Sequence, residues 1–335
     1  MGAALASVFA SEAGAAARTP ATPAEFYKGR TVYVVIGYTP GGGYDLYARV
    51  LAQHMSKHIP GNPTVIPQNM PGAGSLKAAN YIYSVAPKDG ATFGTFARAM
   101  GSAALIGHAN FDARKFTWIG SITKDVSLCV SWAGSPIKTW NDVMTKQFTA
   151  GGDGADADPD IFAKLYKNVF GAKIRLATGF PGTSDIALAM QRGEVHGLCG
   201  LSYSTLKSQH GDWVKDRKVN ILLQAAPAKD PELQHVPLAS DFARTPEQRQ
   251  ILDFVMVSQV MARPFAAPPG IPAARKAALR AAFDATLKDP AFLADTKKMF
   301  LDVNPVSGAE VDALIASLYA TPKDVVARTA RAITN

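Results

Sequence analysis

Near the start of the chain, a short apolar run is followed by apolar residues at helical spacing. The run 31–37, TVYVVIG, is β-branched and almost continuously apolar, which is typical of a strand buried on both faces of a parallel sheet. The glycine-rich loop 38–45 follows, and apolar residues then recur at helical spacing from Leu46 to Met55. This order of strand, loop and helix predicts a βα unit.

Two more units of the same kind follow, with strands expected at 64–67 and 92–96 and a helix at 76–83. Successive βα units need right-handed crossovers, so they predict a doubly wound parallel sheet. A second series of elements precedes an alanine-rich helical tail that begins near Pro272. Its expected strands are 117–122, 127–132, 173–178, 194–201 and 219–224, and its expected helices are 139–143 (with Thr139 as N-cap), 160–169 and 185–191.

The length of 335 residues fits two lobes, and the βα units predict that they are doubly wound α/β lobes; that hinge strands join them is implied by the family resemblance described below. We expect residues 25–124 to form the first part of lobe 1 and residues 125–224 to form lobe 2. Residues 225–335 then return to lobe 1 and supply the C-terminal helices. The expected hinge segments are 123–126 and 221–226.

The first 24 residues are set apart by their composition. Residues 2–17 are mostly small and apolar and end in three alanines, like the end of a secretory signal peptide with its A-x-A cleavage site. We interpret residues 1–24 as a truncated export signal and expect a periplasmic protein. An alanine-rich leader without a targeting role is the alternative.

The distribution of charge limits the kinds of partner that we expect. The net charge is +8, but the basic residues are dispersed and are not interleaved with aromatic residues. This distribution predicts no nucleic-acid partner and favours anionic small molecules or an acidic protein as the partner.

Cys129 and Cys199 form no C-x-x-C motif. We expect two buried free thiols, and a disulfide is the alternative in an oxidising compartment.

Four loops follow expected strands and precede expected helices, where ligands bind in open α/β sheets. They are residues 40–45, 69–75, 99–102 and 180–184. Unpaired N–H groups and the positive end of the helix dipole favour oxyanions there. The motifs G-x-G-x-x-G, G-x-x-x-x-G-K-[ST], H-E-x-x-H and G-x-S-x-G are absent from the sequence. The sequence therefore predicts anion binding, and we expect no catalytic residue, cofactor or metal.

Several motifs resemble, in their order and spacing, those of the Bug/TctC family, the extracytoplasmic solute receptors of tripartite tricarboxylate transporters. A P-G-G-G-x-D loop occupies residues 40–45, an N-x-P-G-A-G loop residues 69–74 and a P-x-D-G turn residues 87–90. The segments GFPGTSDIALAMQRGEVHGL (179–198) and RPFAAPPGIP (263–272) extend the resemblance. It covers nearly the whole chain after the leader.

The resemblance implies a type II periplasmic-binding-protein fold, whose two lobes close on a small carboxylate. It also implies that the partners are membrane permease subunits of a tripartite tricarboxylate-type transporter. We expect a monomer that is not an enzyme. The expected ligand-binding residues are Tyr38, Pro40, Gly41, Gly42, Gly43, Tyr44, Asp45, Gly72, Ala73, Gly74, Ser75, Arg98, Ser102, Asp156, Asp158, Gly182, Thr183, Ser184 and Gly200.

Two departures from the family pattern put the ligand's identity in doubt. Many relatives have an S-G-x-G-T-S loop where this chain has DGADAD at 153–158, and many have Asp where this chain has Gly200. Asp158 and Asp160 suit the start of a helix. The sharper interpretation places Asp156 or Asp158 against a cationic or amide group of the ligand, or against a metal ion.

Our main hypothesis is a solute-binding protein for a di-, tri- or aromatic carboxylate. We expect main-chain N–H groups of residues 41–43 and 72–74, rather than arginine or lysine, to neutralise the carboxylate. Lys77 and Arg98 are then expected to face solvent or to act without touching the ligand. The alternatives are a transferase or hydrolase that uses Asp45 or the 153–158 loop, and a sensory receptor.

Overall fold

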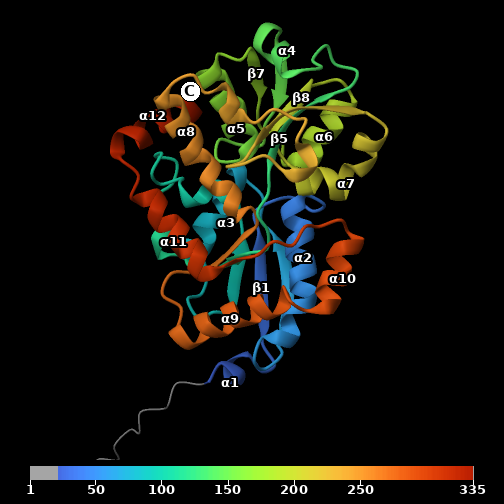
Figure 1. The fold of residues 1–335 in the computed structure, drawn as a ribbon. Helices are drawn as coiled ribbons and strands as arrows, with labels where there is room; N and C mark the ends of the chain where they lie inside the picture. Colours follow the sequence, from blue (N-terminus) through green and yellow to red (C-terminus); the bar gives the residue numbers. More distant parts are fainter. Residues whose placement is uncertain (1–21, 335) are drawn as a thin grey trace, which may run out of the picture.

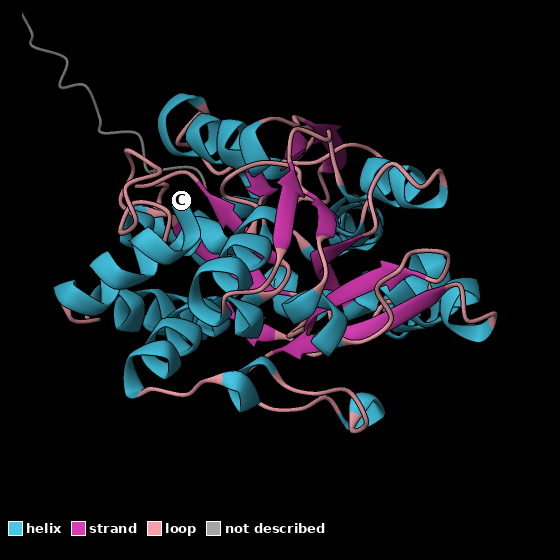
Figure 2. Ribbon diagram, turned by 90° about the horizontal axis from the view of Figure 1, so that it is seen from above, coloured by secondary structure: helices cyan, strands magenta, loops and turns pink. Residues whose placement is uncertain are grey.

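The computed structural model describes residues 22–334, which form two lobes, one above the other in Figure 1. Each lobe has one mixed sheet, with helices around the strands (Figure 2). The sheet of lobe 1 has the order β11-β4-β10-β3-β1-β2, and that of lobe 2 has the order β7-β6-β8-β5-β9. The strands are β1 (Thr31–Ile36), β2 (Thr64–Asn69), β3 (Thr92–Thr95), β4 (Thr117–Ser121), β5 (Ser127–Trp132), β6 (Phe148–Gly151), β7 (Ile174–Ala177), β8 (Gly197–Ser202), β9 (Val219–Ala225), β10 (Pro264–Ala267) and β11 (Val306–Ser307).

The parallel part of each sheet comes from βα units. β1 lies parallel to β2 and β3, and β6 lies parallel to β7 and β8. Antiparallel strands complete the sheets, with β10 between β3 and β4 and β5 between β8 and β9. The predicted α/β fold of two lobes is confirmed. The sequence analysis missed β6, β10 and β11, because these short strands carry too few residues for an apolar period to show.

Helices cover both sheets. α2 packs on β1 and β2 and contacts α9 and α10, while α9 and α11 pack on β4. In lobe 2, α5 and α6 pack on β8, and α12 packs on α5 and α8. The helices are α1 (Pro23–Tyr27), α2 (Gly43–Met55), α3 (Leu76–Asn80), α4 (Trp140–Thr145), α5 (Asp158–Phe170), α6 (Thr183–Gln191), α7 (Tyr203–Lys215), α8 (Pro246–Met256), α9 (Ala273–Thr286), α10 (Pro290–Lys298), α11 (Gly308–Tyr319) and α12 (Lys323–Thr334).

Local sequence explains where two helices of lobe 2 begin. Thr139 caps α4, because its hydroxyl accepts from Asp142 N at 3.2 Å while the Asp142 carboxylate accepts from Thr139 N at 3.0 Å. The predicted N-cap is confirmed. α5 begins at Asp158, two residues before the predicted start, because Pro159 is well suited to the first turn of a helix.

Two segments, 122–126 and 259–263, run side by side between the lobes. Three backbone hydrogen bonds join them: Ile122 N to Arg263 O at 3.2 Å, Ala262 N to Thr123 O at 3.0 Å and Asp125 N to Gln259 O at 3.1 Å. The hinge predicted at 221–226 is wrong, because residues up to 225 belong to β9 and pair with β5. The lobe boundaries near residues 24, 124 and 224 stay a prediction.

Cys129 and Cys199 form a disulfide, so the expectation of two free thiols is wrong. The two residues are direct partners in the antiparallel pairing of β5 with β8, and both are fully buried. Opposed residues on antiparallel strands bring their Cβ atoms close together. A separation of 70 residues hides this proximity in the sequence.

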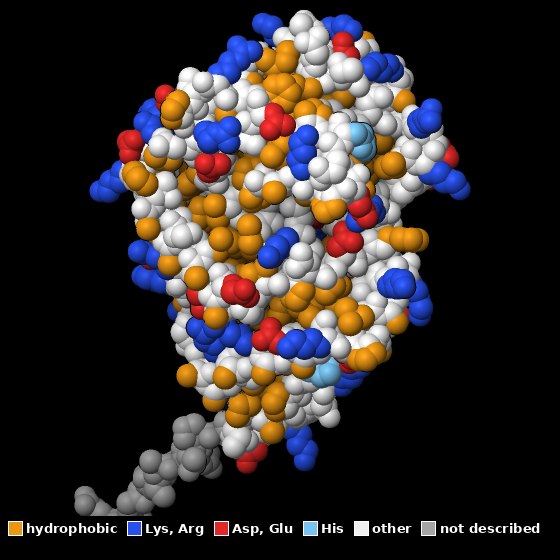
Figure 3. Space-filling model, in the orientation of Figure 1, with side chains coloured by type: hydrophobic (Ala, Val, Ile, Leu, Met, Phe, Trp, Pro, Cys, Tyr) orange, Lys and Arg blue, Asp and Glu red, His pale blue; other side chains and the backbone are white. Residues whose placement is uncertain are grey.

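The surface charge is mixed, and the start of the chain lies outside the described residues. On the face drawn in Figure 3, lysine and arginine side chains are scattered over both lobes among acidic and uncharged side chains. Within residues 22–334, no helix is both long and apolar enough to cross a membrane. Residues 1–21, which make up most of the predicted export signal, lie outside the described residues, and α1 begins at Pro23.

Candidate functional site

A small cavity lies between the lobes, next to residues that follow the carboxyl ends of β1, β3 and β6. Ligands of open α/β sheets bind at such strand ends. We call this space the inner cavity; its volume is about 30 Å³. It is lined by Tyr38, Gly43, Tyr44, Arg98, Asp153, Asp158, Pro159, Thr183, Gly200, Leu201, Ser202, Thr205 and Arg263.

The first turns of four helices from both lobes line the inner cavity. They contribute Gly43 and Tyr44 of α2, Asp158 and Pro159 of α5, Thr183 of α6 and Thr205 of α7. The first N–H groups of a helix lack partners inside the helix, and its amino-terminal end is the positive end of the helix dipole. The backbone therefore makes this cavity favourable to an anion.

Arg98 lies in a short 3₁₀ helix after β3 and is 2% exposed. Its Nε lies 2.7 Å from Asp158 Oδ2, and its Nη2 contacts the same oxygen and donates to Ser127 Oγ at 2.8 Å. Although burial opposes it, the Asp158 carboxylate raises the pKa of Arg98 above its ordinary value, so the guanidinium is charged. Its Nη1 is buried and has no hydrogen-bond partner among residues 22–334.

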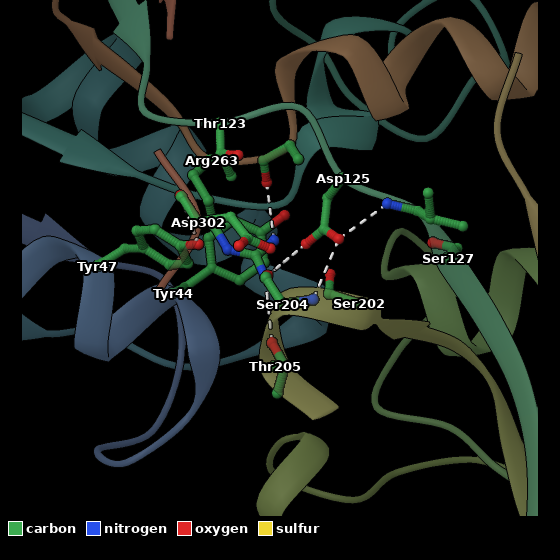
Figure 4. A network of polar contacts seen from close by, with 12 residues as sticks. Tyr44, Tyr47, Thr123, Asp125, Ser127, Ser202, Ser204, Thr205, Arg263 and Asp302 are labelled. Carbon is green, nitrogen blue, oxygen red and sulfur yellow. Dashed lines mark hydrogen bonds and ion pairs between the residues drawn. The ribbon is translucent and has the colours of Figure 1, made fainter. Parts of the chain in front are cut away.

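Arg263 immediately precedes β10 and is 1% exposed. Its Nη2 lies 3.3 Å from Asp125 Oδ2 and donates to the hydroxyls of Ser204 and Thr205, both at 3.1 Å (Figure 4). The guanidinium also lies over the Tyr44 ring, 4.8 Å from its centroid. Its Nε is buried and finds no partner within the described part of the chain.

Asp153 follows β6 and is 8% exposed. Neither carboxylate oxygen accepts a hydrogen bond from any residue that the structure describes. Burial, and then the carboxylates of Asp160 and Asp158, raise the pKa of Asp153 well above its ordinary value. Asp160 is itself engaged, because its oxygens accept from Gly154 N at 2.9 Å and from the Thr178 hydroxyl at 2.6 Å.

A wider groove opens from the inner cavity. This outer groove has a volume of about 400 Å³ and is lined by Gly37, Tyr38, Pro71, Gly72, Ala73, Gly74, Ser75, Asp153, Gly154, Gly179, Phe180 and Pro181. Tyr38 and Asp153 line both spaces, so the two spaces meet there. Of the described residues that line the outer groove, only Asp153 has a carboxylate, and none has a basic side chain. Burial raises the pKa of Tyr38, so its hydroxyl keeps its proton.

The structure brings together a little over half of the residues predicted to bind ligand. Tyr38, Gly43, Tyr44, Arg98, Asp158, Thr183 and Gly200 line the inner cavity, and Gly72, Ala73, Gly74 and Ser75 line the outer groove. Pro40, Gly41, Gly42, Asp45, Ser102, Asp156, Gly182 and Ser184 line neither space.

Some of the residues outside both spaces have structural roles. Asp45 accepts from Gly41 N at 2.9 Å, from Arg49 Nε at 2.8 Å and from Asn69 Nδ2 at 2.8 Å. It therefore holds the glycine loop in place. Asp156 pairs with His108, at 2.5 Å, instead of pointing to the site.

The predicted position of Asp158 at the start of a helix is confirmed, and its contact with a ligand stays a prediction. Asp158 takes the first position of α5, but it pairs with Arg98 and makes no side-chain cap. The expectation that Arg98 faces solvent is wrong, because Arg98 lies buried at the inner cavity. Ser75, predicted to bind ligand, uses its hydroxyl to accept from Ala97 N at 2.6 Å.

The sequence analysis missed Arg263 and Thr205 as residues of the site, and it considered Asp153 only as part of the 153–158 loop of an alternative enzyme. Arg263 returns from the far end of the chain, and no local motif marks it. Asp153 lies directly after β6, and an acidic residue at the end of a strand would have been a signal if β6 had been predicted. Thr205 belongs to the first turn of α7, a helix that the apolar pattern did not indicate.

Close backbone approach is required at Gly43 and Gly74. A Cβ at Gly43 would lie 2.3 Å from Thr205 Oγ1, and one at Gly74, whose φ is +59°, would lie 2.9 Å from Ala157 N. Both contacts join lobe 1 to lobe 2. Gly42 has φ of −78°, and a Cβ there would meet only Thr39 O at 3.8 Å. Gly43 rather than Gly42 is thus the glycine that the closed cleft needs.

Among residues 22–334, no cluster of three or more His, Cys, Asp or Glu side chains could hold a metal ion.

The two-lobed fold is that of solved periplasmic binding proteins. Periplasmic binding protein BugD aligns with a TM-score of 0.73 at 18% identity, over 89% of this chain and 97% of that chain. MatC from Rhodopseudomonas palustris with bound malate aligns with a TM-score of 0.69 at 21% identity, over 89% and 99% of the two chains. Rpa4515 of R. palustris with adipate gives 0.70 at 18% identity, over 90% and 97%. The predicted resemblance to the Bug/TctC proteins is confirmed in the fold.

Sequence similarity to known proteins covers a smaller part of the chain than structural similarity does. No family model matches the chain. The chain is 33% identical over 141 residues to the UPF0065 protein in gbd 5'region of Cupriavidus necator. That match spans 39% of this chain and 39% of the relative's length.

Proposed function

We propose that this chain is a periplasmic solute-binding protein that captures a small carboxylate between its lobes. We propose that the ligand is a di-, tri- or aromatic carboxylate. The protein acts as a monomer and delivers this ligand to the permease subunits of a tripartite tricarboxylate-type transporter. The proposal's support in the comparisons is that proteins of the same fold are periplasmic binding proteins, two of them with malate and adipate.

One observation carries the proposal. Arg98 Nη1 and Arg263 Nε are buried donors at the same interlobe cavity, and neither has a partner within residues 22–334. A buried donor without a partner costs about 1–3 kcal/mol, and more for a charged group. A carboxylate oxygen would remove that cost and would also meet the first turns of α2, α6 and α7. The backbone of these turns and the two guanidiniums then act together, whereas the sequence predicted the backbone alone.

A thermal-shift screen followed by titration calorimetry tests the proposal. We expect at least one small carboxylate among malate, adipate, citrate and benzoate to raise the melting temperature. Ligand at a hundredfold excess over its Kd adds roughly 2.7 kcal/mol to the free energy of unfolding. Stabilisation by a neutral sugar, with no effect of any carboxylate, would overturn the proposal.

Delivery to a transporter needs its own test. A pull-down with the candidate permease subunits should retain them more strongly when the saturating carboxylate is present, because a ligand bound between the lobes shifts the population toward the closed form. Retention of a signalling protein in place of the permease would favour the sensory alternative.

A further inference from the structure

Asp153 has a carboxylate that the proposed function leaves unexplained. It is 92% buried, because only 8% of its surface is exposed, and both of its oxygens lack a hydrogen-bond partner within residues 22–334. It lines the inner cavity and the outer groove at once. A ligand that fills both spaces therefore has to pass beside this carboxylate.

The charges around the site do not compensate Asp153. Arg98 is paired with Asp158, and Arg263 is paired with Asp125. Each of the two buried cations at the inner cavity thus already faces one carboxylate. The remaining acid, Asp153, has no cation of its own, and the outer groove offers none from the described residues that line it.

No described residue satisfies the hydrogen bonds of the Asp153 side chain in either protonation state. Burial and the neighbouring carboxylates of Asp160 and Asp158 raise its pKa, which favours the protonated form. A protonated carboxyl still leaves one donor and one acceptor unused. A ligand carboxylate at this point would use the donor alone, and it would meet three acidic residues. An ammonium group supplies up to three donors and the missing positive charge.

We propose that the ligand is an amino-carboxylate: its carboxylate binds at Arg98 and Arg263 in the inner cavity, and its protonated amine binds Asp153 where the cavity meets the outer groove. This inference rests on the proposed function and names the ligand class. The outer groove, at about 400 Å³, accommodates the remainder of such a molecule, since ligand pockets of about 300–1,000 Å³ are usual.

Pairs of ligands that differ only by the amine test this inference by titration calorimetry on the full chain. The probes are succinate with aspartate, glutarate with glutamate, and adipate with 2-aminoadipate. We expect the amine-bearing member of at least one pair to bind about tenfold to a hundredfold more tightly, the value of a hydrogen bond to a charged group. Equal or tighter binding of the plain dicarboxylate in every pair would overturn the inference while leaving the proposed function intact. No binding by any of the six would also overturn the inference, and the proposed function would fail with it only if malate, citrate and benzoate did not bind either.

The variant Asp153→Asn keeps the shape of the side chain but cannot take the negative charge that would pair with an ammonium group. It should abolish the preference for the amine while leaving the affinity for the plain dicarboxylate equal or higher. A merely structural role of Asp153 would weaken both members of a pair by the same factor, and that result would contradict the inference. Asp185→Asn is the matched control, because it removes one negative charge from the first turn of α6 without lining either space. It should leave the ratio between the affinities for the amine-bearing and the plain ligand unchanged. The same ratio measured on the wild type tests the inference even if a variant does not fold.

Discussion

At the scale of single residues, the site combines completed ion pairs with buried atoms that lack a partner. Arg98 and Asp158 come from different lobes, and their side chains are 1% and 10% exposed. Such a pair has lost most of its hydration, so the two charges depend on each other. Arg98 therefore holds the lobes together through this pair, and we propose that its unpaired Nη1 binds the ligand.

Arg98→Met should destabilise the protein by about 3–5 kcal/mol, because Asp158 would stay buried without its cation. Urea denaturation measures this loss. The double variant Arg98→Met/Asp158→Leu should recover most of the stability, since a buried ion pair can be replaced by apolar side chains at little cost.

Arg114→Met is the matched control for that experiment. Arg114 pairs with Asp112 at the surface, where its side chain is 58% exposed, so the loss should be about 0–1 kcal/mol. A loss for Arg98→Met as small as that of the control would contradict the role of the buried pair.

Gly43→Ala should weaken ligand binding and destabilise the closed protein, whereas Gly42→Ala should change little. The new methyl group at residue 43 would meet Thr205 Oγ1 of the other lobe at 2.3 Å, and overpacking of this kind costs about 1–3 kcal/mol. Calorimetry with the best carboxylate from the screen measures the effect. Equal behaviour of the two variants would mean that the lobes do not need this close approach.

At the scale of elements, the sequence predicted those helices and strands whose formation depends on neighbouring residues in the chain. The β1–α2 unit was foreseen because a β-branched run, a glycine loop and a helical period follow one another directly. β10 was not predicted, because its four residues include a proline and because it pairs with strands that are distant in the chain. Arg263 and the Cys129–Cys199 pair were missed for the same reason, since each depends on a register between distant segments.

The disulfide between β5 and β8 should stabilise lobe 2. Removing a native disulfide typically costs about 2–5 kcal/mol, so Cys129→Ala/Cys199→Ala should melt at a lower temperature than the wild type. A reducing agent should lower the melting temperature of the wild type and leave that of the double variant unchanged. A wild-type melting temperature that does not respond to reduction would contradict a stabilising role.

At the scale of the whole molecule, two side-by-side segments and the turn between α11 and α12 connect the lobes, and several contacts hold the lobes together across the cleft. Besides the Arg98–Asp158 pair, Lys207 of α7 contacts Asp302 of lobe 1 at 2.9 Å. Hinge closure around a ligand depends on such contacts, since they set the balance between open and closed forms. The chain thus has the connectivity that a closing cleft requires.

Asp302→Ala should weaken ligand binding by at most about fivefold, because a partly exposed ion pair contributes about 0–1 kcal/mol. The Lys207 and Asp302 side chains are 28% and 47% exposed. Small-angle scattering of the unliganded variant should show a larger radius of gyration than the wild type. Asp212→Ala, which breaks a pair with Lys218 inside lobe 2, should change neither quantity. A similar effect of both variants would mean that the Lys207–Asp302 pair does not favour closure.

The central claim is that the buried donors of Arg98 and Arg263 bind the ligand's carboxylate inside the interlobe cavity. A crystal structure grown with the carboxylate that most raises the melting temperature tests it most directly. We predict a carboxylate oxygen about 2.7–2.9 Å from Arg98 Nη1 or Arg263 Nε, the usual length of a charge-assisted hydrogen bond. A ligand bound elsewhere, with both nitrogens still unpaired, would contradict the claim.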